Sequence, residues 1–95
     1  IESIINRLPK QATYGYYRTT GGAEIDLVID MGNEDLWAVE VKRFTAPTLS
    51  RGFYSACEDL NPTKKFVVHS GAERFPLADG IEAVTLSDLL EAIHP

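Results

Sequence analysis

Hydrophobic and polar residues alternate along the first half of the chain, which is the pattern of β-strands with one buried face. The alternation is clean over residues 23–31 and 36–44, and the Tyr- and Thr-rich segment 13–19 is also typical of a strand. Glycine-containing turns separate these segments at 20–22 and 32–34. We therefore expect three consecutive strands, of which the last two form an antiparallel hairpin.

Apolar residues at helical spacing predict three helices around these strands. Ile1, Ile4, Ile5 and Leu8 share one helix face, which Pro9 ends. A second apolar stripe follows a cap at Thr48 and runs to Leu60, and a third helix follows a capping box formed by Thr85 and Asp88. Between them we expect strands at 64–70 and 81–84 joined by a loop at 71–80. The predicted order is α-β-β-β-α-β-β-α.

Composition places the chain among single globular domains. It has 95 residues, of which 44% are hydrophobic and 24% charged, so we expect one domain over residues 1–95, a fragment of a longer protein. The longest apolar runs are too short to cross a membrane. One cysteine, Cys57, excludes an internal disulfide and a cysteine-based zinc site, and favours a reducing compartment, most simply the cytoplasm.

Negative charge is concentrated in one segment. The net charge is 9 − 14 = −5, and residues 21–40 hold six acidic residues and no lysine or arginine, so this segment is −6 and the remainder +1. That balance argues against a basic face for duplex DNA. The acidic cluster is either a solvated surface or a site for a cation.

The register of the predicted hairpin brings two acids together. If the turn is centred on Asn33, opposed residues have numbers that sum to 66, so Asp26 faces Glu40. The large apolar residues then share the other face, which packs on the helices: Ile25, Leu27, Ile29, Trp37, Val39 and Val41. We expect a common core that contains Leu27, Ile29, Trp37, Val39, Phe53, Cys57, Phe66 and Val68.

Two opposed carboxylates repel each other unless one is protonated or a cation lies between them. Their spacing suits Mg²⁺ or Mn²⁺, with the carbonyl oxygen of Val41 as a third ligand, and Lys42 on the same face would orient a bound water or offset developing negative charge. The alternative is a wet acidic face beside a surface ion pair between Glu24 and Lys42. We interpret His69 and His94 as structural or incidental.

Two motifs resemble a known family. The segment 17–26 (YRTTGGAEID) and the segment 38–42 (AVEVK), with the later 65–69 (KFVVH) and 75–81 (FPLADGI), are similar to the C-terminal domain of a large group of bacterial and archaeal P-loop ATPases. That domain is of uncharacterised function and is similar to PD-(D/E)XK nucleases. The resemblance covers nearly the whole chain.

The resemblance implies an α/β fold with a restriction-endonuclease-like core, in which helices flank a mixed central sheet. Asp26 and Glu40 would match the metal-binding acids and Lys42 the catalytic lysine, while Glu2 is the candidate for an acid on the first helix. The implied function is a Mg²⁺- or Mn²⁺-dependent phosphodiesterase acting on nucleic acid. The alternative is a non-catalytic docking or regulatory module. In either case the implied partner is an N-terminal P-loop ATPase domain.

Overall fold

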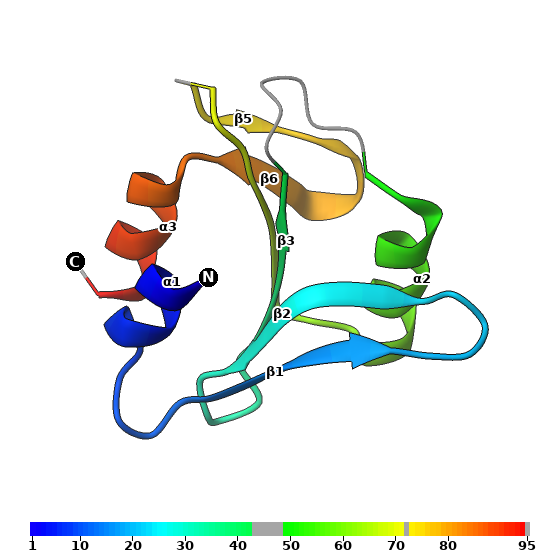
Figure 1. The fold of residues 1–95 in the computed structure, drawn as a ribbon, viewed down its shortest axis with the longest axis horizontal. Coiled ribbons are helices and arrows are strands. Elements are labelled where there is room, and N and C mark those ends of the chain that lie inside the picture. The colour runs from blue at the N-terminus through cyan, green and yellow to red at the C-terminus, as the bar shows by residue number, and fades with distance from the viewer. Residues whose placement is uncertain (43–48, 72, 95) are drawn as a thin grey trace.

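A mixed β-sheet separates two layers of helix (Figure 1). The computed structural model describes residues 1–42, 49–71 and 73–94. The sheet contains β1 (Thr13–Arg18), β2 (Glu24–Asp30), β3 (Leu36–Val41), β4 (Lys64–Val68), β5 (Phe75–Pro76) and β6 (Ile81–Val84). The helices are α1 (Glu2–Arg7), α2 (Arg51–Leu60) and α3 (Leu86–Ile93), with a short 3₁₀ turn, η1 (Ala78–Gly80).

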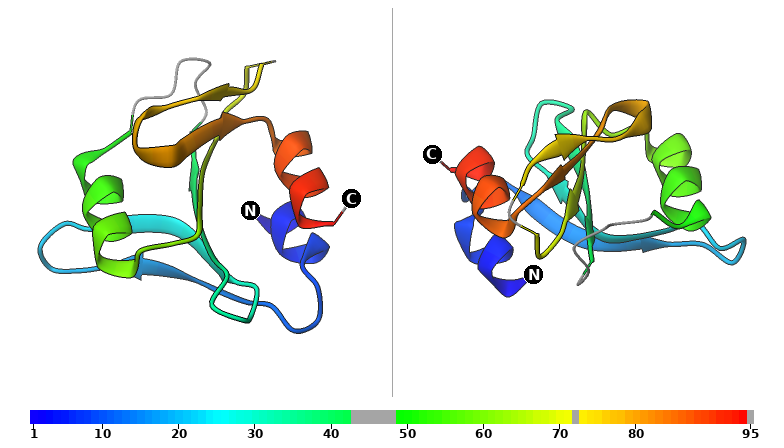
Figure 2. Two further views of the ribbon diagram at one scale, coloured as in Figure 1. Left: turned by 180° about the vertical axis from the view of Figure 1, so that it is seen from behind. Right: turned by 90° about the horizontal axis from the view of Figure 1, so that it is seen from above.

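The strand order is β1-β2-β3-β4-β6-β5. Strands β1, β2 and β3 form an antiparallel meander, β3, β4 and β6 run parallel, and β5 pairs antiparallel with β6. Helix α2 crosses between β3 and β4 on one face of the sheet, and α1 and α3 lie together on the other face (Figure 2). The expected α/β class and mixed sheet with an antiparallel hairpin are confirmed.

The segment 71–80 is more structured than the expected loop. It contains the two-residue strand β5 and the turn η1, where Asp79 has a positive φ of 61°. Alternation could not reveal β5, because a strand of two residues has no period. Pro76 is tolerated there because β5 is the edge of the sheet.

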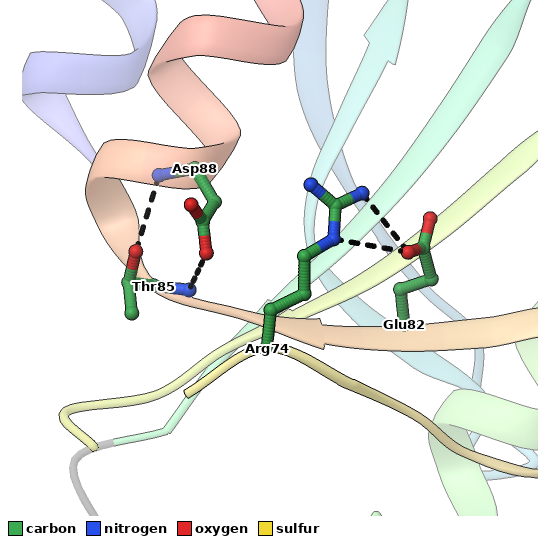
Figure 3. A network of polar contacts seen from close by, with 4 residues as sticks. All are labelled: Arg74, Glu82, Thr85 and Asp88. Carbon is green, nitrogen blue, oxygen red and sulfur yellow. Dashed lines mark hydrogen bonds and ion pairs between the residues drawn. The ribbon is translucent and has the colours of Figure 1, made fainter. Parts of the chain in front are cut away.

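Helices α2 and α3 each begin at a side-chain cap. Ser50 caps α2 by accepting a hydrogen bond from the Phe53 N–H. The cap expected at Thr48 lies outside the described residues, as does the end of the strand that was expected to reach Phe44. The capping box at α3 is confirmed: the Thr85 hydroxyl accepts from the Asp88 N–H, and the Asp88 carboxylate accepts from the Thr85 N–H (Figure 3). Arg74 and Glu82, also in Figure 3, form an ion pair that joins the segment before β5 to β6.

Two hydrophobic clusters fill the space between the sheet and the helices. The first lies under α1 and α3 and contains Ile4, Leu27, Ile29, Trp37, Val39, Phe66, Val68, Val84 and Leu89. The second lies under α2 and contains Ala23, Ile25, Ala38, Phe53, Ala56, Cys57, Val67 and Ile81. All eight residues of the predicted core are buried, but Phe53 and Cys57 belong to the second cluster, so the expectation of one common core is wrong. The sheet separates the clusters because it is covered on both faces.

Ile25 lies on the face opposite to the one expected. The pairing of β1 with β2 shifts between Gly15, which pairs with Val28, and Tyr17, which pairs with Ile25. Asp26 and Leu27 are therefore both opposite Tyr16, which is the arrangement of a β-bulge. The extra residue reverses the alternation, so Ile25 packs under α2 while Leu27 packs under α1 and α3.

None of the helices in the described part of the chain has the length and apolar character needed to cross a bilayer.

Candidate functional site

Asp26 and Glu40 meet where the β2–β3 ladder ends. The register of this hairpin is as predicted, with pairs Leu27–Val39, Val28–Ala38, Ile29–Trp37 and Asp30–Leu36. Beyond the Leu27–Val39 pair, the Asp26 side chain replaces the backbone ladder: its Oδ2 accepts a hydrogen bond from the Val41 N–H at 3.0 Å. At the bulge in β2, the side chain of Asp26, instead of its backbone, thus bonds to the end of β3.

Glu40 is the buried acid of the pair. It is 5% exposed, and it faces α2, because its parallel partner on β4 is Val67 of the second cluster. Its Oε1 is buried and has no hydrogen-bond partner. Burial, and after it the neighbouring Asp26 carboxylate, together raise the pKa of Glu40 to about 7, although Lys42 partly opposes both effects. A buried carboxylate with an unpaired oxygen is costly unless a proton or a cation compensates it.

Lys42 supplies a positive charge next to Glu40. Its Nζ is 3.6 Å from Glu40 Oε2, and its side chain is 27% exposed, so the ammonium reaches from solvent to the buried acid. The Lys42 N–H donates to the Val68 carbonyl at 2.8 Å, which extends the β3–β4 ladder by one residue. The surface ion pair expected between Glu24 and Lys42 is wrong: Glu24 pairs with Arg18 at 2.9 Å.

Glu2 is not brought to these residues. It is exposed in the first turn of α1, which lies on the side of the sheet opposite to the one that Glu40 faces (Figure 1). Within the described ranges it makes no hydrogen bond or ion pair to Asp26, Glu40 or Lys42. The structure therefore assembles two acids and one lysine, and Glu2 as the helix acid stays a prediction.

The oxygen donors fit a hard divalent cation better than a soft one. Asp26 and Glu40 provide carboxylates only, and Mg²⁺ is commonly held by one or two carboxylates with several waters. No group of three or more His, Cys, Asp or Glu side chains in a metal-binding arrangement occurs among residues 1–42, 49–71 and 73–94. The unpaired Glu40 Oε1 is the observation that favours a cation, and the small number of protein ligands indicates a weak site.

Cys57 and His69, two other residues that the sequence singled out, are both buried. Cys57 lies in the second cluster, and burial raises the pKa of its thiol to about 11, so the thiol stays protonated and behaves as a core residue, as expected. His69 is 4% exposed and directly follows β4. Its buried Nε2 has no hydrogen-bond partner, which the interpretation of His69 as an ordinary structural residue did not foresee.

The fold and the site together define a class: a mixed α/β domain with a carboxylate–lysine cluster at the end of a hairpin. The chain belongs to the DUF4143 family, described as a domain of unknown function, whose model matches residues 1–89. Two uncharacterised proteins, one from Mycobacterium bovis and one from Mycobacterium tuberculosis, are each 36% identical over 75 residues. The match covers 79% of this chain and 17% of each relative, so the chain spans only a small part of their length. No solved structure matches the chain.

Proposed function

We propose that this domain is a divalent-metal-dependent phosphodiesterase that acts on nucleic acid, with a restriction-endonuclease-like core. The carrying observation is the buried, unpaired Oε1 of Glu40, whose carboxylate lies beside that of Asp26 and forms an ion pair with Lys42 through Oε2. The proposal also includes an N-terminal P-loop ATPase domain as the partner in the longer protein, and a cytoplasmic location. The resemblance of the two motifs to that ATPase-associated, nuclease-like domain supports these further parts.

Each residue has a separate task in the proposed reaction. Asp26, Glu40 and the Val41 carbonyl would hold Mg²⁺ or Mn²⁺, which lowers the pKa of a coordinated water and polarises the phosphodiester when it is bound. The hydrogen bond from the Val41 N–H fixes Asp26 Oδ2, which leaves Oδ1 for a ligand. The Lys42 ammonium offsets the negative charge that develops on the phosphate oxygens.

Metal binding is tested by thermal melts in EDTA, in Mn²⁺ and in NaCl of matched ionic strength. A ligand at ten times its Kd stabilises the folded state by about 1.4 kcal/mol, which raises the melting temperature of a domain of this size by about 5–10 °C. Asp26→Asn keeps an oxygen that accepts from Val41 but removes one charge. We expect this variant to melt higher than the parent in EDTA, and to lose most of the Mn²⁺ response.

Asp30→Asn is the matched control, because Asp30 is an exposed acid on the same strand and an asparagine oxygen can still accept from the Gly32 N–H. This variant keeps the Mn²⁺ response of the parent. Equal shifts with Mn²⁺ and NaCl in all three proteins would mean that Mn²⁺ acts only through ionic strength, and would overturn the metal site.

Catalysis is tested with labelled single- and double-stranded DNA and RNA in Mn²⁺ and in EDTA. Lys42→Ala should lower the cleavage rate by about 100-fold or more and leave the Mn²⁺-induced melting shift in place. The second candidate function, a non-catalytic docking module, is favoured by the distance in the fold between Glu2 on α1 and the face that holds Glu40. A parent protein that binds Mn²⁺ but cleaves none of these substrates would support that candidate instead.

A further inference from the structure

The carboxyl ends of the interior strands β3 and β4 lie side by side at one end of the sheet (Figure 1). Glu40 is paired with Val67 and Val41 with Val68, and the Lys42 N–H bonds to the Val68 carbonyl. One residue further along each strand, Lys42 and His69 are therefore neighbours in the parallel register. Ligand sites of α/β sheets form just outside the carboxyl ends of the parallel strands.

His69 is on the same face as Glu40 and Lys42. Side chains of β4 alternate between Phe66 and Val68, which pack under α1 and α3, and Val67, which packs under α2. The His69 N–H still pairs with the Val84 carbonyl of β6 at 3.0 Å, so the strand geometry continues and the side chain follows Val67 to the α2 face. The ring of His69 contacts the ring of Phe75, with centroids 5.5 Å apart, which supports this placement. Phe75 is paired with Ala83, which lies two residues from Ile81 of the second cluster and therefore on the α2 face.

A hydrogen bond at Nδ1 determines the tautomer of the neutral His69 ring. Nδ1 accepts a hydrogen bond from the Gly71 N–H at 2.9 Å, so the neutral ring carries its proton on Nε2. Nε2–H is buried and unpaired, and leaving such a donor without an acceptor is unfavourable. In the described part of the chain, the two buried side-chain polar atoms without a partner are this donor and Glu40 Oε1.

Resting on the phosphodiesterase function proposed above, we infer that His69 is a phosphate-binding residue of the same site. Its Nε2–H donates to a non-bridging phosphate oxygen of the bound nucleic acid, next to the Lys42 ammonium. A phosphate diester offers only hydrogen-bond acceptors, so it can pair with a donor such as His69 Nε2–H and with a cation such as Lys42. Asp26 and Glu40 are negatively charged, so they can contact the phosphate only through a metal ion. Because Nε2 is buried in the free protein, a phosphate oxygen reaches it only when neighbouring side chains move aside.

Two substitutions separate the two nitrogen atoms of His69. In His69→Gln the side-chain amide replaces the donor at Nε2 and loses the acceptor at Nδ1, whereas in His69→Asn the amide oxygen replaces the acceptor for Gly71 and no donor remains at Nε2. We measure the melting temperature in EDTA, the Mn²⁺-induced melting shift, and the Kd for a short labelled single-stranded oligonucleotide in Mg²⁺. We expect both variants to keep the Mn²⁺ shift, His69→Gln to bind the oligonucleotide within about threefold of the parent, and His69→Asn to bind it about tenfold or more weakly.

The outcomes are distinct. Oligonucleotide binding that is normal in His69→Asn and weakened in His69→Gln would show that only the bond to Gly71 matters, and would overturn the role of His69. Loss of the Mn²⁺ shift in both variants would identify His69 as a metal ligand and overturn it too. A parent without any Mn²⁺ shift would overturn the proposed function, and the inference with it.

If His69→Asn does not fold, the inference is tested by NMR on the parent protein alone. The ¹⁵N-labelled Nε2–H resonance of His69 should move on addition of oligonucleotide and Mg²⁺, as a new hydrogen bond forms. An unchanged resonance at a saturating oligonucleotide concentration would contradict the inference.

Discussion

Glu40 is the residue at which burial and charge oppose each other most strongly. Its carboxylate is almost covered, and its pKa rises from an ordinary value near 4.5 to about 7. The folded protein therefore holds the Glu40 proton more tightly than the unfolded chain does. Between about pH 4.5 and pH 7 the folded state binds more protons, so the free energy of unfolding falls as the pH rises through this range.

Glu40→Gln should remove this pH dependence in metal-free buffer. At pH 5 the parent carries a protonated Glu40, and the two proteins should melt at similar temperatures. At pH 8 the variant should be more stable by up to about 3 kcal/mol, because no buried charge remains. Melts in EDTA at both pH values measure the difference, with Glu91→Gln, an exposed acid on α3, as the control. A difference that does not grow from pH 5 to pH 8 would mean that Glu40 ionises as it does in the unfolded chain.

The sequence predicted the pair Asp26 and Glu40 because the hairpin register follows from two local features, the turn at Gly32–Glu34 and the apolar alternation on both strands. It did not predict that Asp26 bonds to the Val41 N–H, or that Ile25 changes face. Both depend on how β1 pairs with β2, and the bulge opposite Tyr16 has no pattern within β2 itself. The position of His69 was likewise hidden, because it depends on two parallel strands that are distant in sequence.

At the scale of elements, α2 is seated against the turn between β1 and β2. A Cβ atom added to Gly52 would clash with the Gly22 carbonyl oxygen and lie 3.5 Å from the Glu24 nitrogen, so the first turn of α2 touches the backbone that leads into β2. This contact sets the distance between α2 and the strand that carries Asp26. Only glycine allows the two backbones to approach so closely.

Gly52→Ala should therefore push α2 away from the sheet and destabilise the protein by about 1–3 kcal/mol. Gly15→Ala is the matched control, because a Cβ atom on Gly15 would meet nothing within 4 Å. That variant should remain within about 0.5 kcal/mol of the parent. Urea unfolding of the three proteins measures both effects. A Gly52→Ala variant as stable as the parent would show that α2 can shift freely over the second cluster.

Across the whole molecule, the order of elements could be predicted and the division of the core could not. The sequence of each amphipathic element predicts one apolar face, such as the face of α2 that carries Phe53 and Cys57. Which elements share a layer depends on the crossover connection between β3 and β4, which places α2 on the face of the sheet opposite α1 and α3. The interior strands β3 and β4 are buried on both faces and serve both layers, so their sequence alone does not assign α2 to either.

The net charge of −5, concentrated around the hairpin, makes the isolated domain a poor ligand for duplex DNA. In EDTA at physiological salt we expect its Kd to be weaker than the 10⁻⁴–10⁻⁶ M that is typical of non-specific DNA-binding proteins. Mg²⁺ should strengthen binding in the parent, because a cation at Asp26 and Glu40 removes repulsion of the phosphates.

Asp26→Asn should gain much less from Mg²⁺ than the parent, and Asp30→Asn as much as the parent, which separates a site effect from general screening. Fluorescence anisotropy with a labelled duplex measures all three. Tight binding in EDTA would contradict the expectation and indicate a basic face. An equal gain in all three proteins would instead show that Mg²⁺ acts on the charge of the whole molecule, since screening does not depend on any one carboxylate.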